Sequence, residues 1–198
     1  ILTTHHFNTW EGGGAIHDVF VNAHLMRGLN YLSTDRPEQA LTDFQTALEY
    51  PDNLEVGRPI VDPDACRTYV LLGQTHQAKG DEKTAMRYFE KAAALPTGGD
   101  MDYYKAKALE FLGNVENANA LYSELIKTGQ QRLEGGEIDF FAKFGERQAQ
   151  NRRLGAAHYL IGLGQLGLGD VAQASDSFLQ AQSYDVNNVW VNYYLETI

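Results

Sequence analysis

Cysteine is nearly absent from this 198-residue sequence, which contains only Cys66. A single cysteine cannot form an internal disulfide, and it supplies no set of thiolates for a structural metal. A reducing compartment suits such a chain best. Cys66 stands near an expected helix start, where a thiol can be mildly activated, but a buried structural role is favoured. No cofactor is expected.

Positive charge is also in deficit. The chain has 16 Lys and Arg residues against 26 Asp and Glu, which gives a formal net charge of -10. A surface of this sign repels phosphate backbones and anionic membranes. Neither nucleic acid nor a membrane is therefore an expected partner.

Long hydrophobic runs are missing as well. No stretch of about 18 apolar residues is present, and no basic segment followed by an apolar one stands at the N-terminus. We therefore expect no membrane-spanning helix, no signal peptide and a cytoplasmic location. The sequence begins at Ile1 without an initiator Met, which suggests an excerpt from a longer parent. With 43% hydrophobic and 21% charged residues, the chain is expected to fold.

A four-point pattern recurs along the sequence. A small residue is followed after 12 positions by Ala, after 4 more by an aromatic residue, and after 3 more by a small or apolar residue. The four copies are Gly28-Ala40-Phe44-Ala47, Gly73-Ala85-Phe89-Ala92, Ala106-Ala118-Tyr122-Leu125 and Gly162-Ala174-Phe178-Ala181. The spacing predicts helical hairpins, in which the small residue lets two helices approach and the other three form one stripe on the second helix. Turn residues such as Gly80-Asp81 and Gly169-Asp170 stand between the paired helices.

These units resemble tetratricopeptide repeats, over roughly residues 17–188. That family carries Gly or Ala in the first helix, then Ala, Phe and Ala in the second, with Pro near the exit, as Pro96 stands here. The opening segment is similar to one that precedes the C-terminal repeat tail of large bacterial proteins of unknown function. The resemblance implies an all-α fold, an α-α superhelix of about four hairpins with a C-terminal closing helix.

The repeat is irregular, and its irregularities define the expected organisation. A non-helical lead-in at 1–14 precedes a helical domain at 15–198. The expected parts of that domain are hairpins at about 17–50, 65–96, 99–129 and 152–184, insertions at about 52–64 and 130–151, and a closing helix at about 188–198. The aromatic residues of the closing helix must bury against another part of the chain.

Tetratricopeptide repeats bind partners along a groove lined by their first helices, so the resemblance implies groove candidates. By alignment of the hairpins these are Asn22, Leu25, Arg67, Gln74, Gln77, Tyr103, Lys107 and Tyr159. Only Arg67 and Lys107 are cationic, so the family's clamp for a C-terminal carboxylate is not expected. A groove of this composition suits an extended peptide, a helix or a neighbouring domain of the parent.

The lead-in is rich in chemically capable side chains, and its binding candidates are His6, Trp10, Glu11 and His17. A metal site is disfavoured because His17 and His24 are seven positions apart, whereas two ligands on a helix are best four apart. Packing or capping roles are preferred for these histidines. Glu11 and Asp18 beside His17 could also form an acid/base pair, which is disfavoured against a helix cap.

The second insertion contains Glu134, Glu137 and Asp139, which could suggest the paired carboxylates of a glycosidase. A loop followed by an amphipathic turn, anchored by Phe140, Phe141 and Phe144, is the preferred interpretation. A partner-contacting loop is the next alternative.

The sequence thus predicts a protein-binding or scaffolding module with no catalytic residues. Two other hypotheses stay open: an ancillary C-terminal domain of a larger, carbohydrate-related enzyme, and a small metal or ligand site in the lead-in. The oligomeric state is not predicted.

Overall fold

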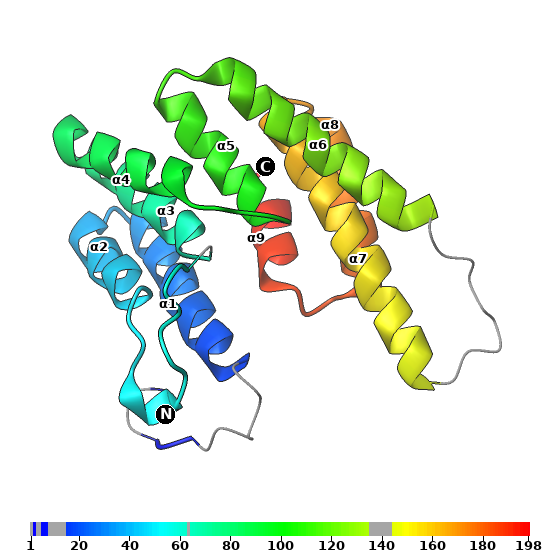
Figure 1. The fold of residues 1–198 in the computed structure, drawn as a ribbon, viewed down its shortest axis with the longest axis horizontal. Helices are drawn as coiled ribbons and strands as arrows, with labels where there is room; N and C mark the ends of the chain where they lie inside the picture. The colour runs from blue at the N-terminus through cyan, green and yellow to red at the C-terminus, as the bar shows by residue number, and fades with distance from the viewer. Residues whose placement is uncertain (1, 3–4, 8–14, 63, 135–143) are drawn as a thin grey trace. The chain divides into compact units, whose positions relative to one another are not determined.

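The computed structural model of the chain describes residues 2, 5–7, 15–62, 64–134 and 144–198. Over these residues all regular structure is helical, with no strand, and the all-α prediction is confirmed. The helices are α1 (Ala15–Ser33), α2 (Pro37–Thr46), the 3-10 turn η1 (Asp52–Leu54), α3 (Ala65–Ala78), α4 (Glu82–Ala94), α5 (Met101–Phe111), α6 (Val115–Glu134), α7 (Phe144–Gly167), α8 (Val171–Tyr184) and α9 (Val189–Thr197) (Figure 1).

The chain divides into two compact units, Ile1–Thr97 and Gly98–Ile198, called unit 1 and unit 2 below. Unit 1 contains the hairpins α1–α2 and α3–α4. Unit 2 contains α5–α6 and α7–α8, followed by α9. In each hairpin the two helices pack on each other, as the repeat pattern predicts.

Local chemistry reverses the chain inside each hairpin. Between α3 and α4, Gly80 has a φ of +79°, a left-handed conformation that glycine adopts without steric cost. The carboxylate of Asp81 then accepts a hydrogen bond from the backbone N–H of Thr84 at 3.2 Å, which caps α4. In the first hairpin Asp35 takes the left-handed position with a φ of +55°, which Asp tolerates better than most residues.

The repeated small residue and aromatic residue meet in the core of the three hairpins in which the small residue is glycine. Phe44, Phe89 and Phe178 are fully buried. A Cβ atom added at Gly28 or Gly73 would lie closer than 3.0 Å to three ring atoms of the partner phenylalanine, Phe44 or Phe89. The glycines are therefore required by close packing, because any side chain there would occupy the volume of the ring.

Unit 2 differs from the expected boundaries because its helices are longer. The second insertion was expected at about 130–151, but α6 continues to Glu134 and α7 begins at Phe144. Just before this extension, α6 approaches α7 closely at Gly129, whose added Cβ would lie 2.6 Å from the carbonyl oxygen of Ala157. Glu134 is exposed at the end of α6. The remaining predicted residues of this insertion, Glu137, Asp139 and the 140–141 pair, lie outside the described residues, as does the side chain of Phe144.

Candidate functional site

The first insertion of unit 1 is a loop tied down at both ends. The hydroxyl of Tyr50 donates to Oδ2 of Asp62 at 2.8 Å. Arg58 donates from its guanidinium to the carbonyl oxygen of Leu48 at 2.7 Å, and the same guanidinium lies 5.3 Å from the centre of the Tyr50 ring. Leu54 in η1 is buried beneath the loop. These contacts hold the loop in one conformation.

Asp62 joins this loop to the next helix. Its Oδ1 accepts the backbone N–H groups of Asp64 at 3.1 Å and Ala65 at 3.3 Å, so the carboxylate satisfies donors at the start of α3. Burial, followed by the hydrogen bond to Asp62, raises the pKa of the Tyr50 hydroxyl well above its usual range. Tyr50 therefore remains a neutral donor to Asp62 throughout the physiological pH range.

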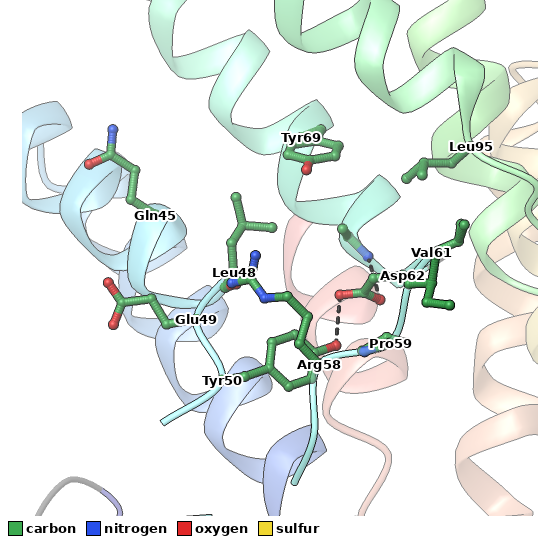
Figure 2. Close-up of a pocket in the computed structure, with 12 residues that line it drawn as sticks. Gln45, Leu48, Glu49, Tyr50, Arg58, Pro59, Val61, Asp62, Tyr69 and Leu95 are labelled. Atoms are coloured by element: carbon green, nitrogen blue, oxygen red, sulfur yellow. Dashed lines mark hydrogen bonds between the residues drawn. The ribbon is translucent and has the colours of Figure 1, made fainter. Parts of the chain in front are cut away.

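A pocket of about 490 Å³ opens between this loop and the second hairpin (Figure 2). We call it the insertion pocket. Its walls are Gln45, Leu48, Glu49 and Tyr50 near the end of α2, residues 58–62 of the loop, Ala65 and Tyr69 of α3, and Leu95 after α4. All of these residues belong to unit 1. The insertion was predicted to interrupt the repeat, whereas the pocket that it creates was not predicted.

The lead-in residues that the structure describes are attached to the same insertion. The side-chain amide of Asn53 donates to the carbonyl oxygens of Leu2 at 2.9 Å and His5 at 2.8 Å, and the backbone N–H of Phe7 donates to the carbonyl of Asn53 at 2.8 Å. His6 is exposed, with its Nδ1 3.5 Å from Oε1 of Glu55. Trp10 and Glu11, the other two predicted residues of this segment, lie outside the described residues.

His17, a predicted binding residue of the lead-in, makes contacts with residues at the end of the first hairpin. Its ring stacks on Tyr50 with 3.9 Å between the ring centres, and its Nε2 donates to the carbonyl oxygen of Glu49 at 3.0 Å. The ring is buried and links α1 to the end of α2. In the part of the chain that the structure describes, no three His, Cys, Asp or Glu side chains gather in a way that could hold a metal ion.

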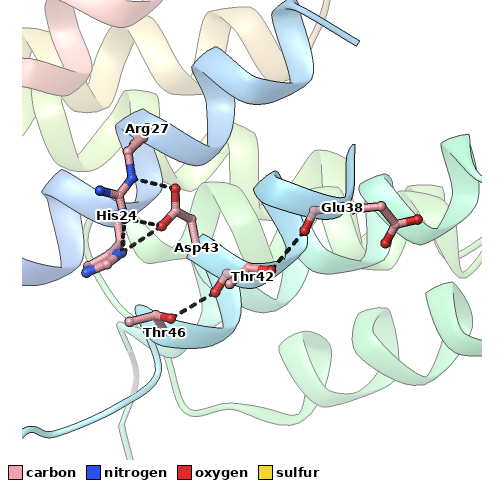
Figure 3. Close-up of polar contacts among 6 residues, drawn as sticks. All are labelled: His24, Arg27, Glu38, Thr42, Asp43 and Thr46. Carbon is pink, nitrogen blue, oxygen red and sulfur yellow. Dashed lines mark hydrogen bonds and ion pairs between the residues drawn. The ribbon is translucent and has the colours of Figure 1, made fainter. Parts of the chain in front are cut away.

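A polar cluster connects α1 to α2 within the first hairpin (Figure 3). The buried carboxylate of Asp43 accepts from Nε of Arg27 at 2.7 Å, from a second guanidinium nitrogen, and from Nδ1 of His24 at 2.9 Å. Burial alone would raise the pKa of Asp43. The hydrogen bonds from Arg27 and His24 outweigh burial and hold that pKa below its usual range. Asp43 is therefore a charged, buried residue that joins α2 to α1 within the hairpin.

The predicted groove residues of unit 1 lie on the first helices α1 and α3, with differing exposure. Leu25 and Arg67 are buried, whereas Asn22, Gln74 and Gln77 are half-buried. None of these five residues lines the insertion pocket.

The predicted groove residues of unit 2 are covered by the chain itself. Tyr103 of α5 is 7% exposed and Tyr159 of α7 is 6% exposed. Both rings contact Tyr194 of α9, at centre-to-centre distances of 6.0 Å and 6.4 Å. Lys107 is half-buried and forms an ion pair with Glu110 at 2.7 Å. Burial, the largest cause, raises the pKa of both Tyr103 and Tyr194, so these phenols stay neutral.

Three further residues complete this aromatic cluster, and none of them was among the predicted groove residues. The hydroxyls of Tyr104 and Tyr194 are 2.8 Å apart. Tyr194 stacks on Phe178 of α8 at 5.2 Å, and Trp190 contacts Tyr104 edge to face at 6.2 Å. The most extensive packing of α9 is on α8, and its aromatic side chains also reach α5 and α7. We call the surface of α5 and α7 that these side chains contact the first-helix face of unit 2; α9 lies beside these helices in Figure 1. The aromatic residues near the C-terminus were the sequence signal for it.

Comparison with known proteins gives a family for part of the chain. The Tetratricopeptide repeat family matches residues 67–96, which contain most of α3 and all of α4. Superkiller complex protein 3 of Homo sapiens is 31% identical over 106 residues, which are 53% of this chain and 6% of that protein. The chain thus corresponds to a small part of the length of this relative.

Two solved structures of other proteins are also similar. The structure of Pseudomonas aeruginosa PilF is 20% identical, with a TM-score of 0.37, and the match covers 90% of this chain and 67% of that one. MamA is 18% identical, with a TM-score of 0.32, over 86% of this chain and 81% of that one.

The family match confirms the predicted tetratricopeptide repeat for residues 67–96, and the other predicted repeats have the same helical-hairpin form. The further resemblance to the tails of large bacterial proteins stays a prediction. In the residues that the structure describes, no helix has both the length and the apolar character needed to cross a membrane.

Proposed function

Because residues 67–96 match the Tetratricopeptide repeat family, we propose that the chain is a protein-interaction module, not an enzyme, and that unit 2 binds a helix on its first-helix face. The observation that carries this proposal is the position of Tyr194. Its ring is buried among Tyr103, Tyr159 and Phe178, and its hydroxyl contacts that of Tyr104. Tyr103 and Tyr159, two residues that were expected to contact a partner, are thus in contact with α9 of the same chain.

The proposed binding mode is an amphipathic helix lying against a hydrophobic surface. Trp190 and Tyr194 are four positions apart, so both project from one side of α9, and both are buried. Aromatic anchors of this kind supply much of the binding energy at protein interfaces. A partner of this face would therefore be a helix that carries two large aromatic residues at positions i and i+4.

We propose further that α9 is a displaceable occupant of this face. A short connection, residues 185–188, joins it to α8, and the side chain of Asn188 caps its first turn by accepting from the N–H groups of Trp190 and Val191. A helix held by so short a link has a high effective concentration at its site. By competing for the first-helix face, α9 would lower the apparent affinity of a partner helix for that face, although the face itself stays unchanged.

The test is a titration with a labelled synthetic peptide of residues 185–198. Weakening the resident helix by Tyr194→Ala should raise the affinity of this peptide for the full chain by about tenfold over the unmodified chain, because less α9 then competes for the face. Fluorescence anisotropy measures the binding, and circular dichroism checks that the variant is folded.

A peptide that itself carries Tyr194→Ala is the control and should bind neither protein. A folded variant that binds the native peptide no better than the unmodified chain does would contradict the proposal. If Tyr194→Ala unfolds the chain, a protease site placed within 185–188 gives a second test. After cleavage of the full chain, the released α9 fragment should exchange with labelled peptide, and unfolding of unit 2 on cleavage would mean that α9 belongs to its core.

The alternative of an ancillary domain in a larger enzyme stays a prediction.

A further inference from the structure

The insertion pocket is distinct from the first-helix face of unit 2. It is built from residues of unit 1 alone, and no residue of α9 lines it. At about 490 Å³ its volume falls in the range of pockets that bind small ligands or side chains. Leu48, Val61 and Leu95 give it apolar walls, and the ring of Tyr69 closes one side (Figure 2). Such a cavity suits a large apolar side chain.

The rim of the pocket carries an exposed apolar pair. Ile60 is 103% exposed and Val61 is 49% exposed, although both lie in a loop fixed by the Tyr50–Asp62 and Arg58–Leu48 hydrogen bonds. Because these hydrogen bonds already restrict the loop, binding of a partner over Ile60 would cost little conformational entropy in the loop. Ile60 also extends the apolar surface beyond the cavity, so its partner should be larger than the side chain that fills the pocket.

Charge determines which partner fits this surface. Residues 49–64 contain five Asp and Glu residues and a single Arg, and of these Glu49, Asp62 and Arg58 line the pocket. Arg58 already donates to the carbonyl of Leu48 and lies over the Tyr50 ring. Lys91 lies 5.6 Å from the Tyr69 ring centre, and the charge of the segment together with this lysine remains negative. Glu49 is exposed in the pocket wall, shortly after the end of α2. An apolar pocket in an acidic segment is complementary to a basic, apolar peptide.

We propose that the insertion pocket binds an extended peptide in which a large apolar residue stands next to Lys or Arg. The apolar side chain enters the cavity between Leu48, Tyr69 and Leu95. The neighbouring cation faces Glu49 and the acidic loop, and the peptide backbone passes over Ile60. This site is independent of the helix-binding face of unit 2, so one module would engage two different kinds of partner.

The probe is the blocked hexapeptide Gly-Lys-Phe-Leu-Arg-Gly, titrated into the full chain and followed by calorimetry and by the amide resonances of unit 1. Binding should weaken about tenfold on Ile60→Asp and about fivefold on Glu49→Lys, because the first removes apolar contact and the second reverses the rim charge. Affinity should also fall as the salt concentration rises from about 0.05 to about 0.5 M.

Two matched peptides and one matched variant separate the contribution of charge to binding from that of the apolar anchor. Replacing Lys and Arg by Glu tests the charge, and replacing Phe and Leu by Ala tests the apolar anchor; each should reduce binding at least as much as the protein variants. Val186→Asp places the same charge at a 66% exposed valine of unit 2 and should leave binding unchanged.

The proposal is overturned if the acidic peptide binds as tightly as the basic one, if Ile60→Asp binds like the unmodified chain, or if no peptide shifts the resonances of Ile60 and Val61 at millimolar concentration. None of these results bears on α9, because the assay of the first-helix face uses a different peptide and different variants. Failure here and failure of the helix-binding proposal are therefore distinguishable.

Discussion

Replacing Phe89 with alanine is expected to lower the free energy of unfolding by about 3 to 5 kcal/mol, one of the largest single-residue effects in the chain. Phe89 is fully buried between α3 and α4, and its ring fills the space left by Gly73. Alanine leaves a cavity there that two packed helices cannot close, because their backbones already touch the ring. Urea denaturation followed by circular dichroism measures the loss.

The complementary change is Gly73→Ala, expected to cost about 1 to 3 kcal/mol. The new Cβ would lie closer than 3.0 Å to three atoms of the Phe89 ring, so the ring or the helix must move. Gly57→Ala is the matched control, because a Cβ at Gly57 meets no atom within 4 Å. That control should be neutral or slightly stabilising.

The double variant tests the contact itself. With Phe89→Ala in place, the space that a Cβ at Gly73 needs is free, so adding Gly73→Ala should cost much less than it does in the unmodified chain. Additive losses would show that the two positions act independently. In that case the small-residue and aromatic pairing would not be the reason for the repeat pattern.

The hairpins could be predicted from the sequence because their determinants are local and periodic. The 12-residue step from Gly73 to Ala85 spans a tight turn, and the turn residue Gly80 is left-handed in the structure. A glycine opposite a phenylalanine indicates two helices in close contact, which the structure contains. The helical period of 3.6 residues per turn places the same stripe of residues inward in each copy.

The insertion pocket could not be predicted in this way. It depends on a hydrogen bond between Tyr50 and Asp62, 12 positions apart, and on Arg58 reaching back to Leu48. No period relates these residues, because a loop repeats neither every 2 nor every 3.6 positions. The boundaries of α6 and α7 were missed for a related reason: the contact of Gly129 with α7 joins segments separated by the second insertion.

The burial of Tyr103 and Tyr159 was missed because it depends on where α9 lies. Alignment of the hairpins assigned both residues to the first helices, and the aromatic content of the C-terminus predicted that its helix must pack on something. The connection at 185–188 decides which surface receives that helix. Sequence patterns do not specify the direction that a four-residue connection gives to the next helix.

Two polar side chains of α1 share one partner in the first hairpin. His24 and Arg27 both donate to Asp43 on α2. The stability of such a buried polar network depends on every member being satisfied.

Replacing Asp43 with asparagine is therefore expected to lower the free energy of unfolding by about 1 to 3 kcal/mol at neutral pH. Asparagine keeps the shape but loses the charge that both donors face. The loss falls below the range for a broken, fully buried ion pair, because Arg27 is 56% exposed and water can solvate its charge once Asp43 is replaced by asparagine. Asp176→Asn, at an exposed position of α8, is the matched control and should have no effect.

The same residue makes a prediction about pH. The folded-state pKa of Asp43 is lowered, so its contribution to stability is fully present above the unfolded-state pKa of about 3.9 and is lost as the pH falls through the lower folded-state value. Arg27 keeps its charge throughout this range. The difference in unfolding free energy between the unmodified chain and Asp43→Asn should thus be present at about pH 5 and should shrink as the pH falls below about pH 4. Urea titrations of both proteins across this range measure it, and a difference that persists undiminished at the lowest pH would mean that packing, not charge, is what Asp43 contributes.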